Sequence, residues 1–497
     1  MKKIAFLFIM IMPALIRAQS LPDSISVVRG EKHVAVLSIS ISGLNEPIAY
    51  ALPNGETAVI KPGGPYWHQY DDNMNLISMT SMRESDSFLA GKANVLFANN
   101  QVYMFFAQVT ESGSKLRYYT KIYNVESKTL IHEIDLFTVP FVYKKTSAYQ
   151  NVIISKDNSK IAVITRCESA KEKELIQISC YDSELNLLWS QTDVELDVND
   201  TYSNNFQIDD AGNIYRLHIS KAGGENKLTL SVYTDDESGA HSTPLDLDNY
   251  TFFDISFNVN EKHGAITMFY GNSECIAKGI VFVEYDKNRN FLHDPVFTEI
   301  PSSVLLNEMC YGEAEGLFSY SFRKLIPLKN GNYAFVAEQS VINDSGQGWV
   351  RHGCIKEKGK GDASSVYNRG SFFVAIFSQK GDILHFVKVP KVQQAGYDTF
   401  IGSGIYSDGS SIYFLFNDNP GNTGMGSNTQ LAYKGSKNCS NVLAIVNENG
   451  DMSRYILPET ATSRMSFSLQ VENKNSEIIY GAVTNGAKYL VGKITIK

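Results

Sequence analysis

Three polar stretches of the chain carry aromatic side chains, and two of them also carry basic side chains, a combination suited to binding. The longest is GQGWVRHGCIKEKGKGDASSVYNRG, residues 346–370. The side chains of interest are Trp349, Arg351, His352, Tyr367 and Arg369 in this stretch, Tyr433 and Lys434 in a second, and Trp67 and Tyr70 in a third. Aromatic rings with neighbouring donors can stack on sugars or anchor a partner protein, and basic residues favour an anionic ligand. Alternatively, the aromatic side chains pack the loops down and the basic ones keep them soluble.

Recognised catalytic motifs are missing from the sequence. It contains no His-Glu-x-x-His pair, no Gly-x-Ser-x-Gly turn, no phosphate-binding P-loop and no Cys-x-x-Cys pair. His68, His352 and His385 do not share a spacing; zinc binding by His68 and His352 with a nearby carboxylate is the alternative to solvated surface histidines. The run NDNPGN lacks the closing glutamate of a calcium loop and is typical of an Asx-rich turn. We therefore expect no metal and no cofactor, and no catalytic residue can be assigned.

Six cysteines remain as candidates for disulfides. Once the loops are placed as below, they suggest the pairs Cys354–Cys439, Cys275–Cys310 and Cys167–Cys180. Disulfides across such loops would restrict the unfolded chain and contribute about 2–4 kcal/mol each. The alternative is that several of these cysteines are free buried thiols.

The elements that must position these residues are short β-strands in a repeat. Runs rich in Val, Ile, Tyr and Phe alternate with Asp, Asn, Gly and Ser turns. Each unit reads as four strands, and the aromatic residue closing the third strand recurs as Tyr181, Tyr233 and Tyr285, at an interval of 52 residues. Four strands per repeat predict a β-propeller. Nearly continuous apolar runs such as VYMFFA and IYFLF favour it over a sandwich, because the middle strands of a blade are buried on both faces.

The repeat can be traced over residues 92–497, which gives about seven blades, or eight if residues 43–91 form a partial blade. The last repeat stops after three strands. We expect the N-terminal run His33–Ser42 to supply its fourth strand and close the ring. Residues 19–91 are then a closing strand and a link. The alternative architecture is two β domains, one of them a C-terminal sandwich.

Antiparallel connectivity places the long connections on one face of the disc. Turns between strands one and two, and three and four, belong to one face; the other connections belong to the opposite face. The long segments are residues 341–371, 417–441, 300–321 and 63–85, and we expect all four on that second face. Long loops on a rigid scaffold commonly carry the binding site.

The first 18 residues are predicted to be a secretory signal peptide, with Lys2 and Lys3 before the apolar run Ile4–Met12. Its ending, ALIRAQS, resembles signal peptides of Bacteroidota, which implies the periplasm, the cell surface or the medium. The tail IIYGAVTNGAKYLVGKITIK also resembles the end of the sorting domains of the type IX secretion route, although it fits the blade repeat better. No later segment predicts a transmembrane helix, and the net charge of −8 gives no reason to expect nucleic acid.

Three functions are compatible with this reading. The first is an exported propeller that binds a protein or glycan on the face with the long loops. The second is an enzyme, a lyase or hydrolase, with its site on the same face. The third is a structural accessory of an envelope complex. The fold alone cannot decide among them.

Overall fold

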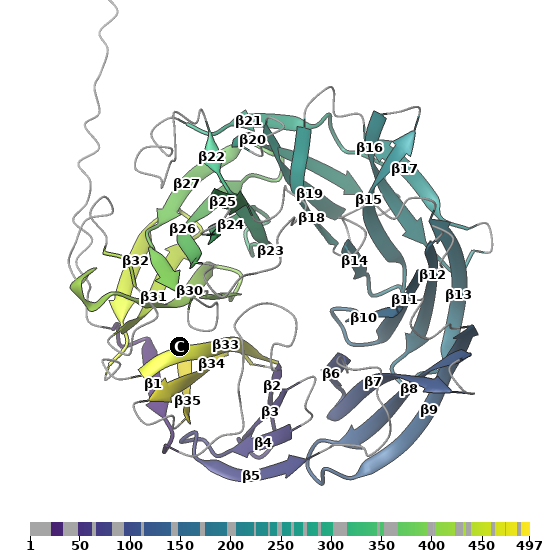
Figure 1. Cartoon of the computed structure of the whole chain (residues 1–497), viewed down its shortest axis with the longest axis horizontal. Coiled ribbons are helices and arrows are strands. Elements are labelled where there is room, and N and C mark those ends of the chain that lie inside the picture. Colours follow the sequence, from purple (N-terminus) through teal and green to yellow (C-terminus); the bar gives the residue numbers. More distant parts are fainter. Residues whose placement is uncertain are drawn as a thin grey trace, which may run out of the picture.

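The computed structural model describes residues 21–32, 48–61, 66–81, 94–110, 114–140, 148–168, 174–195, 205–222, 225–236, 239–245, 251–259, 263–271, 276–286, 290–301, 316–344, 348–351, 366–395, 401, 403–422, 431–433, 439–458, 463–472, 474–484 and 489–497. These residues form strands and one short 3-10 helix, η3 (Pro420–Asn422). The strands make eight four-stranded blades arranged in a ring, with the first strand of each blade innermost (Figure 1). The predicted β-propeller is confirmed, in the eight-blade form.

The first four blades follow the chain in order. Blade 1 contains β2 (Ile48–Ala51), β3 (Thr57–Lys61), β4 (Tyr66–Tyr70) and β5 (Leu76–Ser81); blade 2 contains β6 (Asn94–Ala98), β7 (Gln101–Thr110), β8 (Lys115–Asn124) and β9 (Leu130–Pro140); blade 3 contains β10 (Ala148–Ile154), β11 (Lys160–Glu168), β12 (Glu174–Asp182) and β13 (Leu187–Glu195); blade 4 contains β14 (Asn205–Ile208), β15 (Ile214–Ala222), β16 (Glu225–Tyr233) and β17 (His241–Leu245). Blade 1 is complete where the sequence predicted a link or a partial blade.

The remaining four blades complete the ring, and blades 5 and 6 carry extra short strands. Blade 5 contains β18 (Thr251–Val259), β19 (His263–Gly271), β20 (Ile276–Asp286) and β21 (Val296–Glu299); blade 6 contains β23 (Tyr320–Pro327), β24 (Tyr333–Asp344), β26 (Val366–Phe377) and β27 (Ile383–Val389); blade 7 contains β29 (Ser403–Ser407), β30 (Ser411–Asp418), β31 (Ser440–Asn447) and β32 (Met452–Ile456); blade 8 contains β33 (Ser463–Glu472), β34 (Lys474–Thr484), β35 (Tyr489–Ile496) and β1 (Ile25–Arg29). The extra strands are β22 (Leu317–Phe318), β25 (Gly348–Arg351) and β28 (Gln393–Ala395). They pair with β20, β24 and β26, respectively.

The ring is closed by an N-terminal strand, as expected, but a different run supplies it. β1 pairs antiparallel with β35, from Ile25 opposite Ile496 to Arg29 opposite Gly492. The predicted run, residues 33–42, lies outside the described residues. The shorter run ISVVR pairs with the backbone groups at the open edge of β35. It thereby brings the N-terminal and C-terminal strands into one blade.

The core consists of apolar layers between neighbouring blades. In one such layer, between blades 6 and 7, Phe372 of β26 lies against Phe414 of β30, with ring centroids 4.7 Å apart. In the next, between blades 5 and 6, Phe282 stacks on Phe377 at 5.4 Å. Because each middle strand touches a blade on either side, both of its faces are apolar. This double burial explains the nearly continuous apolar runs in the sequence.

The turn between the third and fourth strands repeats one hydrogen-bonding device. In blade 3, the Asn186 backbone N–H donates to Asp182 Oδ1 (2.8 Å) and its side-chain amide donates to Oδ2 (2.9 Å). Asp71 with Asn75, and Asp286 with Asn290, make the same two contacts. Leu185, directly before Asn186, has φ of 63°, a left-handed conformation that the Asp-centred turn holds in place.

The two faces of the disc differ as the connectivity predicted. We call the face with the second-to-third connections and the blade-to-blade links the loop face, and the opposite one the turn face. β25 and η3 lie in the second-to-third connections of blades 6 and 7, and β28 lies in the link between these two blades, so all three belong to the loop face. Most of the remainder of the predicted loops, residues 302–315, 352–365 and 423–430, lies outside the described residues. The fourth predicted segment, residues 63–85, is not a long link, because β4 and β5 occupy most of it.

Candidate functional site

Buried charge concentrates at the loop-face ends of blades 6 and 7. Glu338 on β24 is fully buried and directly follows the apolar run Tyr333–Ala337 of that strand. Its carboxylate forms an ion pair with the equally buried Lys391, which follows β27. Ser403 at the start of β29 donates its hydroxyl to Glu338 Oε1 at 3.3 Å. A single carboxylate therefore ties blade 6 to the first strand of blade 7.

Two arginines approach the other oxygen of Glu338. Arg323 Nη1 lies 3.4 Å from Oε2, and Arg369 Nη1 lies 4.0 Å from the same atom. Arg323 sits on the innermost strand β23, at a β-bulge between Phe322 and Lys324. Its side chain is 29% exposed, whereas those of Glu338 and Lys391 are 0% exposed. We call Glu338, Lys391, Arg323, Arg369 and Ser403 the Glu338 cluster.

The cations determine the protonation state of Glu338. Burial alone would raise the pKa of its carboxyl, but the charges of Lys391, Arg323 and Arg369 outweigh burial and lower the pKa to about 2. Burial lowers the pKa of Lys391 to about 8, although Glu338 acts in the opposite direction. The Lys391 ammonium also lies 4.6 Å from the centre of the Phe372 ring, a favourable cation–π contact.

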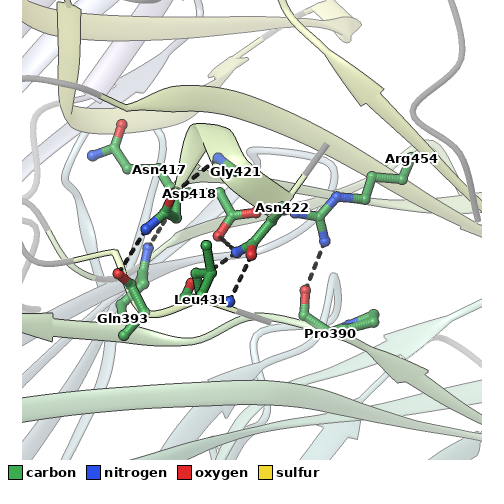
Figure 2. A network of polar contacts seen from close by, with 10 residues as sticks. Pro390, Gln393, Asn417, Asp418, Gly421, Asn422, Leu431 and Arg454 are labelled. Carbon is green, nitrogen blue, oxygen red and sulfur yellow. Dashed lines mark hydrogen bonds and ion pairs between the residues drawn. The ribbon is translucent and has the colours of Figure 1, made fainter. Parts of the chain in front are cut away.

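A second ionic group, which we call the Asp418 network, anchors the loops beside the cluster. Asp418 at the end of β30 forms a buried ion pair with Arg454 of β32. Arg454 Nη1 also donates to the Pro390 carbonyl (2.9 Å), and Asn422 Nδ2 donates to Asp418 Oδ1 (2.9 Å). Figure 2 shows Arg454 reaching toward Pro390 and Asn422 facing Leu431. Burial raises the pKa of Asp418, and the charge of Arg454 opposes this shift.

Amide side chains extend the network to three separate segments. Gln393 Nε2 donates to the Asn417 carbonyl (2.7 Å), and Asn417 exchanges two hydrogen bonds of 2.9 Å with the backbone of Met465 in blade 8. Asn422 bonds the backbone of Leu431 in both directions, at 2.6 and 2.8 Å. The segments around Gln393, η3 and Leu431 are thereby held as a fixed surface rather than left as independent loops.

Of the predicted binding residues, only some lie at this place. Arg369 belongs to the Glu338 cluster. Tyr433 is 1% exposed and packs with Cys439, Ala395 and the partly buried Tyr367. These two tyrosines therefore pack against the loops from inside the protein, as in the alternative in which aromatic side chains pack the loops down. Trp349 and Arg351 belong to β25, but their side chains, and all of His352 and Lys434, lie outside the described residues.

Trp67 and Tyr70 lie elsewhere, in the core of blade 1. Both are 0% exposed, and the backbone around them is the third strand of that blade. Residues buried to this extent cannot contact a ligand at the surface. Burial also raises the pKa of the Tyr70 hydroxyl well above its usual range.

The predicted disulfides are corrected in two cases. Cys180 lies opposite Ala162, and Cys167 lies opposite Leu175, so the two are five residues apart along the paired strands. At about 3.3 Å per residue this exceeds the roughly 7 Å that a disulfide allows. Cys180 and Cys439 are both buried thiols outside any disulfide, so the predicted pair Cys354–Cys439 is not formed either. Cys275 and Cys310 lie outside the described residues, so their pairing stays a prediction.

The sequence analysis missed the charged residues that form the site. Each interrupts or ends an apolar run: Glu338 in YAFVAEQSV, Asp418 in IYFLFND and Arg454 in MSRYI. A charge inside a strand that should be buried on both faces needs a partner. That signal was available, although the partners come from other blades and cannot be paired from sequence.

No group of three potential metal ligands gathers among the described residues. No helix in that part of the chain is long and apolar enough to cross a membrane.

Comparisons with known proteins show similarity of architecture only. No family model and no curated protein sequence matches the chain. Similar solved structures include the WD40 domain of SCAP from fission yeast (10% identity, TM-score 0.42, covering 96% of this chain and 99% of that one) and polysaccharide lyase Uly1 (9%, 0.40, 84% and 94%). Another is the β-propeller domain of the Trilobed protease from Pyrococcus furiosus (10%, 0.35, 81% and 92%). The chain is a β-propeller.

Proposed function

We propose that this β-propeller is an exported binding protein that holds a ligand or partner on its loop face, at blades 6 and 7. The observation that carries the proposal is the Asp418 network. It fixes three loop segments with buried polar contacts from Arg454, Asn422, Gln393 and Asn417. Buried ion pairs contribute little net stability compared with apolar packing. Buried ion pairs at this place are therefore better explained by a binding surface whose loops must keep one conformation.

Export is the second part of the proposal, and the N-terminal 18 residues support it. The charged start and short apolar run are those of a cleaved signal peptide. Expression of the full-length chain in its source organism, followed by N-terminal sequencing of the mature protein, tests this directly. We expect Gln19 as the first residue. An intact Met1 or Lys2 at the N-terminus would contradict export by this route.

The binding proposal is tested with the purified chain from residue 19 onward. It is screened against immobilised glycans and against candidate surface proteins, and any hit is measured again with the double variant Trp349→Ala and Arg351→Ala. The matched control is Leu187→Ala with Leu188→Ala, since both leucines are exposed at the turn-face start of β13 in blade 3. Loss of binding in the first variant alone supports the loop face. Equal loss in both, or in neither, rejects it.

An enzyme remains the second candidate because of Asp254. This residue lies in a β-bulge of β18, the innermost strand of blade 5, with φ of 51°. Burial raises the pKa of its carboxyl to about 7, while a hydrogen bond from the Phe322 backbone N–H has the opposite effect. A strained backbone and a carboxyl able to exchange protons near neutral pH are features of acid–base catalysts. Incubating any glycan hit with the protein and with Asp254→Asn tests this: product formed by the first alone supports catalysis.

A further inference from the structure

The Glu338 cluster holds more positive than negative charge. Glu338 is already paired with Lys391, so the charge of Arg323 is not balanced within the pair. Among the described residues, Glu338 is the carboxylate whose charge acts on Lys391, whereas Arg369 and Arg323 both repel it. In a chain whose net charge is −8, this is a local excess of cations in a mostly buried place.

Two other acids of the neighbouring blades 5 and 7, Asp254 and Asp418, are engaged elsewhere. Asp418 forms its ion pair with Arg454. Asp254 accepts a hydrogen bond from the Phe322 backbone, and its raised pKa reflects burial without compensation from a neighbouring cation. Neither carboxylate is therefore placed to neutralise Arg323. The cations around one carboxylate oxygen repel one another, and a bound anion would reduce this repulsion.

The shape of the cluster leaves one side available to such an anion. Glu338 and Lys391 form a fully buried floor, while the Arg323 side chain is 29% exposed. Arg323 directs Nη1 toward Glu338, and a guanidinium has five N–H donors in a planar fork. The remaining donors of such a fork match the paired oxygens of a carboxylate or sulfate. The β-bulge at Arg323 displaces this residue from the regular ladder of β23.

We propose that Arg323, supported by Arg369, binds an oxyanion of the carboxylate or sulfate class at the loop-face end of blade 6. This inference rests on the proposed binding function and names the chemical group of the ligand that is recognised there. Glu338 is a positioning residue: it orients the two guanidinium groups and does not touch the ligand. Lys391 fixes Glu338 in turn.

The test uses sodium acetate and sodium sulfate as probes in isothermal titration, with sodium chloride as the reference at equal ionic strength. We compare the unmodified protein with Arg323→Gln. Loss of a charged hydrogen-bonding partner should weaken binding by about tenfold or more. The matched control is Arg117→Gln, because Arg117 also contacts two carboxylates, Glu133 and Asp135, but in blade 2. It should bind the probes as the unmodified protein does.

Each result has one meaning. Heat from acetate alone identifies a carboxylate, heat from sulfate alone a sulfate group, and either one supports the proposal if Arg323→Gln abolishes it. No heat from either probe, or equal heat with Arg323→Gln, overturns it. Arg323→Lys keeps the charge but not the fork, so partial binding by this variant separates recognition from a folding defect. Circular dichroism melting of each variant confirms that it is folded.

Failure of this inference can be told apart from failure of the binding function. One outcome is a ligand found by screening that still binds to Arg323→Gln but not to the Trp349→Ala and Arg351→Ala variant. That result supports binding on the loop face and rejects the oxyanion site at Arg323. A ligand whose affinity falls in both variants supports both. A ligand that binds equally to all variants rejects both.

Discussion

Glu338 and Lys391 form an ion pair in which both side chains are completely buried, at the junction of blades 6 and 7. They are 53 residues apart in the chain, on β24 and after β27. Ser403 of the next blade bonds the same carboxylate. The junction therefore depends on a balance of charges, and removing one partner has consequences beyond one lost contact.

Replacing Glu338 by glutamine should lower the free energy of unfolding by about 3–5 kcal/mol, because Lys391 is then a buried cation without its counter-charge. Urea unfolding followed by tryptophan fluorescence measures the change. The control is Glu133→Gln, whose partners Arg117 and Lys121 lie on the outer part of blade 2 with 37% of the Glu133 side chain exposed. That change should cost less than about 1 kcal/mol. Similar losses in both variants would show that burial of the pair is unimportant.

Closure of the ring depends on the short strand β1. Val28 pairs with Lys493 of β35, two residues before Gly30, whose N–H donates to the Val491 carbonyl, and Arg29 Nε donates to the Tyr480 hydroxyl at 3.0 Å. Because hydrogen-bonded positions alternate along an antiparallel strand, Val28 faces β35 as Gly30 does, and proline at position 28 removes a backbone donor from this ladder and should lower the free energy of unfolding by about 2 kcal/mol. Val28→Thr keeps the backbone donor and is the control. Thermal melts of the two variants decide the matter: equal melting temperatures would mean that β1 does not close the ring.

The first blade shows what the repeat in the sequence could have revealed. The marker tyrosines Tyr181, Tyr233 and Tyr285 end their third strands as predicted. Tyr70 occupies the same place in blade 1, 53 residues before Tyr123, and is followed by the Asp71-to-Asn75 turn found again after Tyr181. Its neighbouring aromatic residues instead suggested an exposed binding loop. The repeat interval was the stronger signal, because it reports on the whole blade.

The site itself was only partly predictable. Antiparallel connectivity located the loop face and placed the segment with Trp349 between two strands of blade 6. It could not pair Glu338 with Lys391, or Asp418 with Arg454, because those contacts depend on how strand ends meet across 36 to 53 residues. Sequence patterns report local period and burial, whereas ionic partners at blade junctions are fixed by tertiary packing.

The turn between strands three and four should be a measurable source of stability. Asp182 accepts hydrogen bonds from the backbone of Glu184 (3.0 Å) and from the backbone and side chain of Asn186 (2.8 and 2.9 Å). Asp182→Ala should cost about 1–2 kcal/mol in urea unfolding. Glu184→Ala, in the same turn, is the control and should change stability by less than about 0.5 kcal/mol. An Asp182 variant as stable as this control would contradict a role for the turn.

The thiols of Cys180 and Cys439 should be unreactive in the folded protein. Both are 0% exposed, and burial raises the pKa of Cys180 to about 12 and that of Cys439 to about 11. We expect iodoacetamide to label them, as read by peptide mass spectrometry, only after urea unfolding without reductant. A requirement for reductant at Cys439 would show that it is disulfide-bonded and would contradict the buried thiol of the structure. Labelling of either thiol in the native protein would show that it is not buried.

The carboxyl of Asp254 should make stability depend on pH. Its pKa is raised from 3.8 to about 7 by burial, so the folded state binds a proton more tightly than the unfolded state does. Its contribution to stability is complete below pH 3.8 and falls as the pH rises to about 7. Asp254→Asn removes the ionisation, keeps an acceptor for the Phe322 N–H, and suits φ of 51°, a conformation that asparagine adopts readily. Because part of the residue is exposed, we expect a gain of about 2 kcal/mol at pH 8 and little change at pH 4. Urea unfolding of both proteins at the two pH values measures this, and a gain of equal size at both would show that the charge of Asp254 is not the cause.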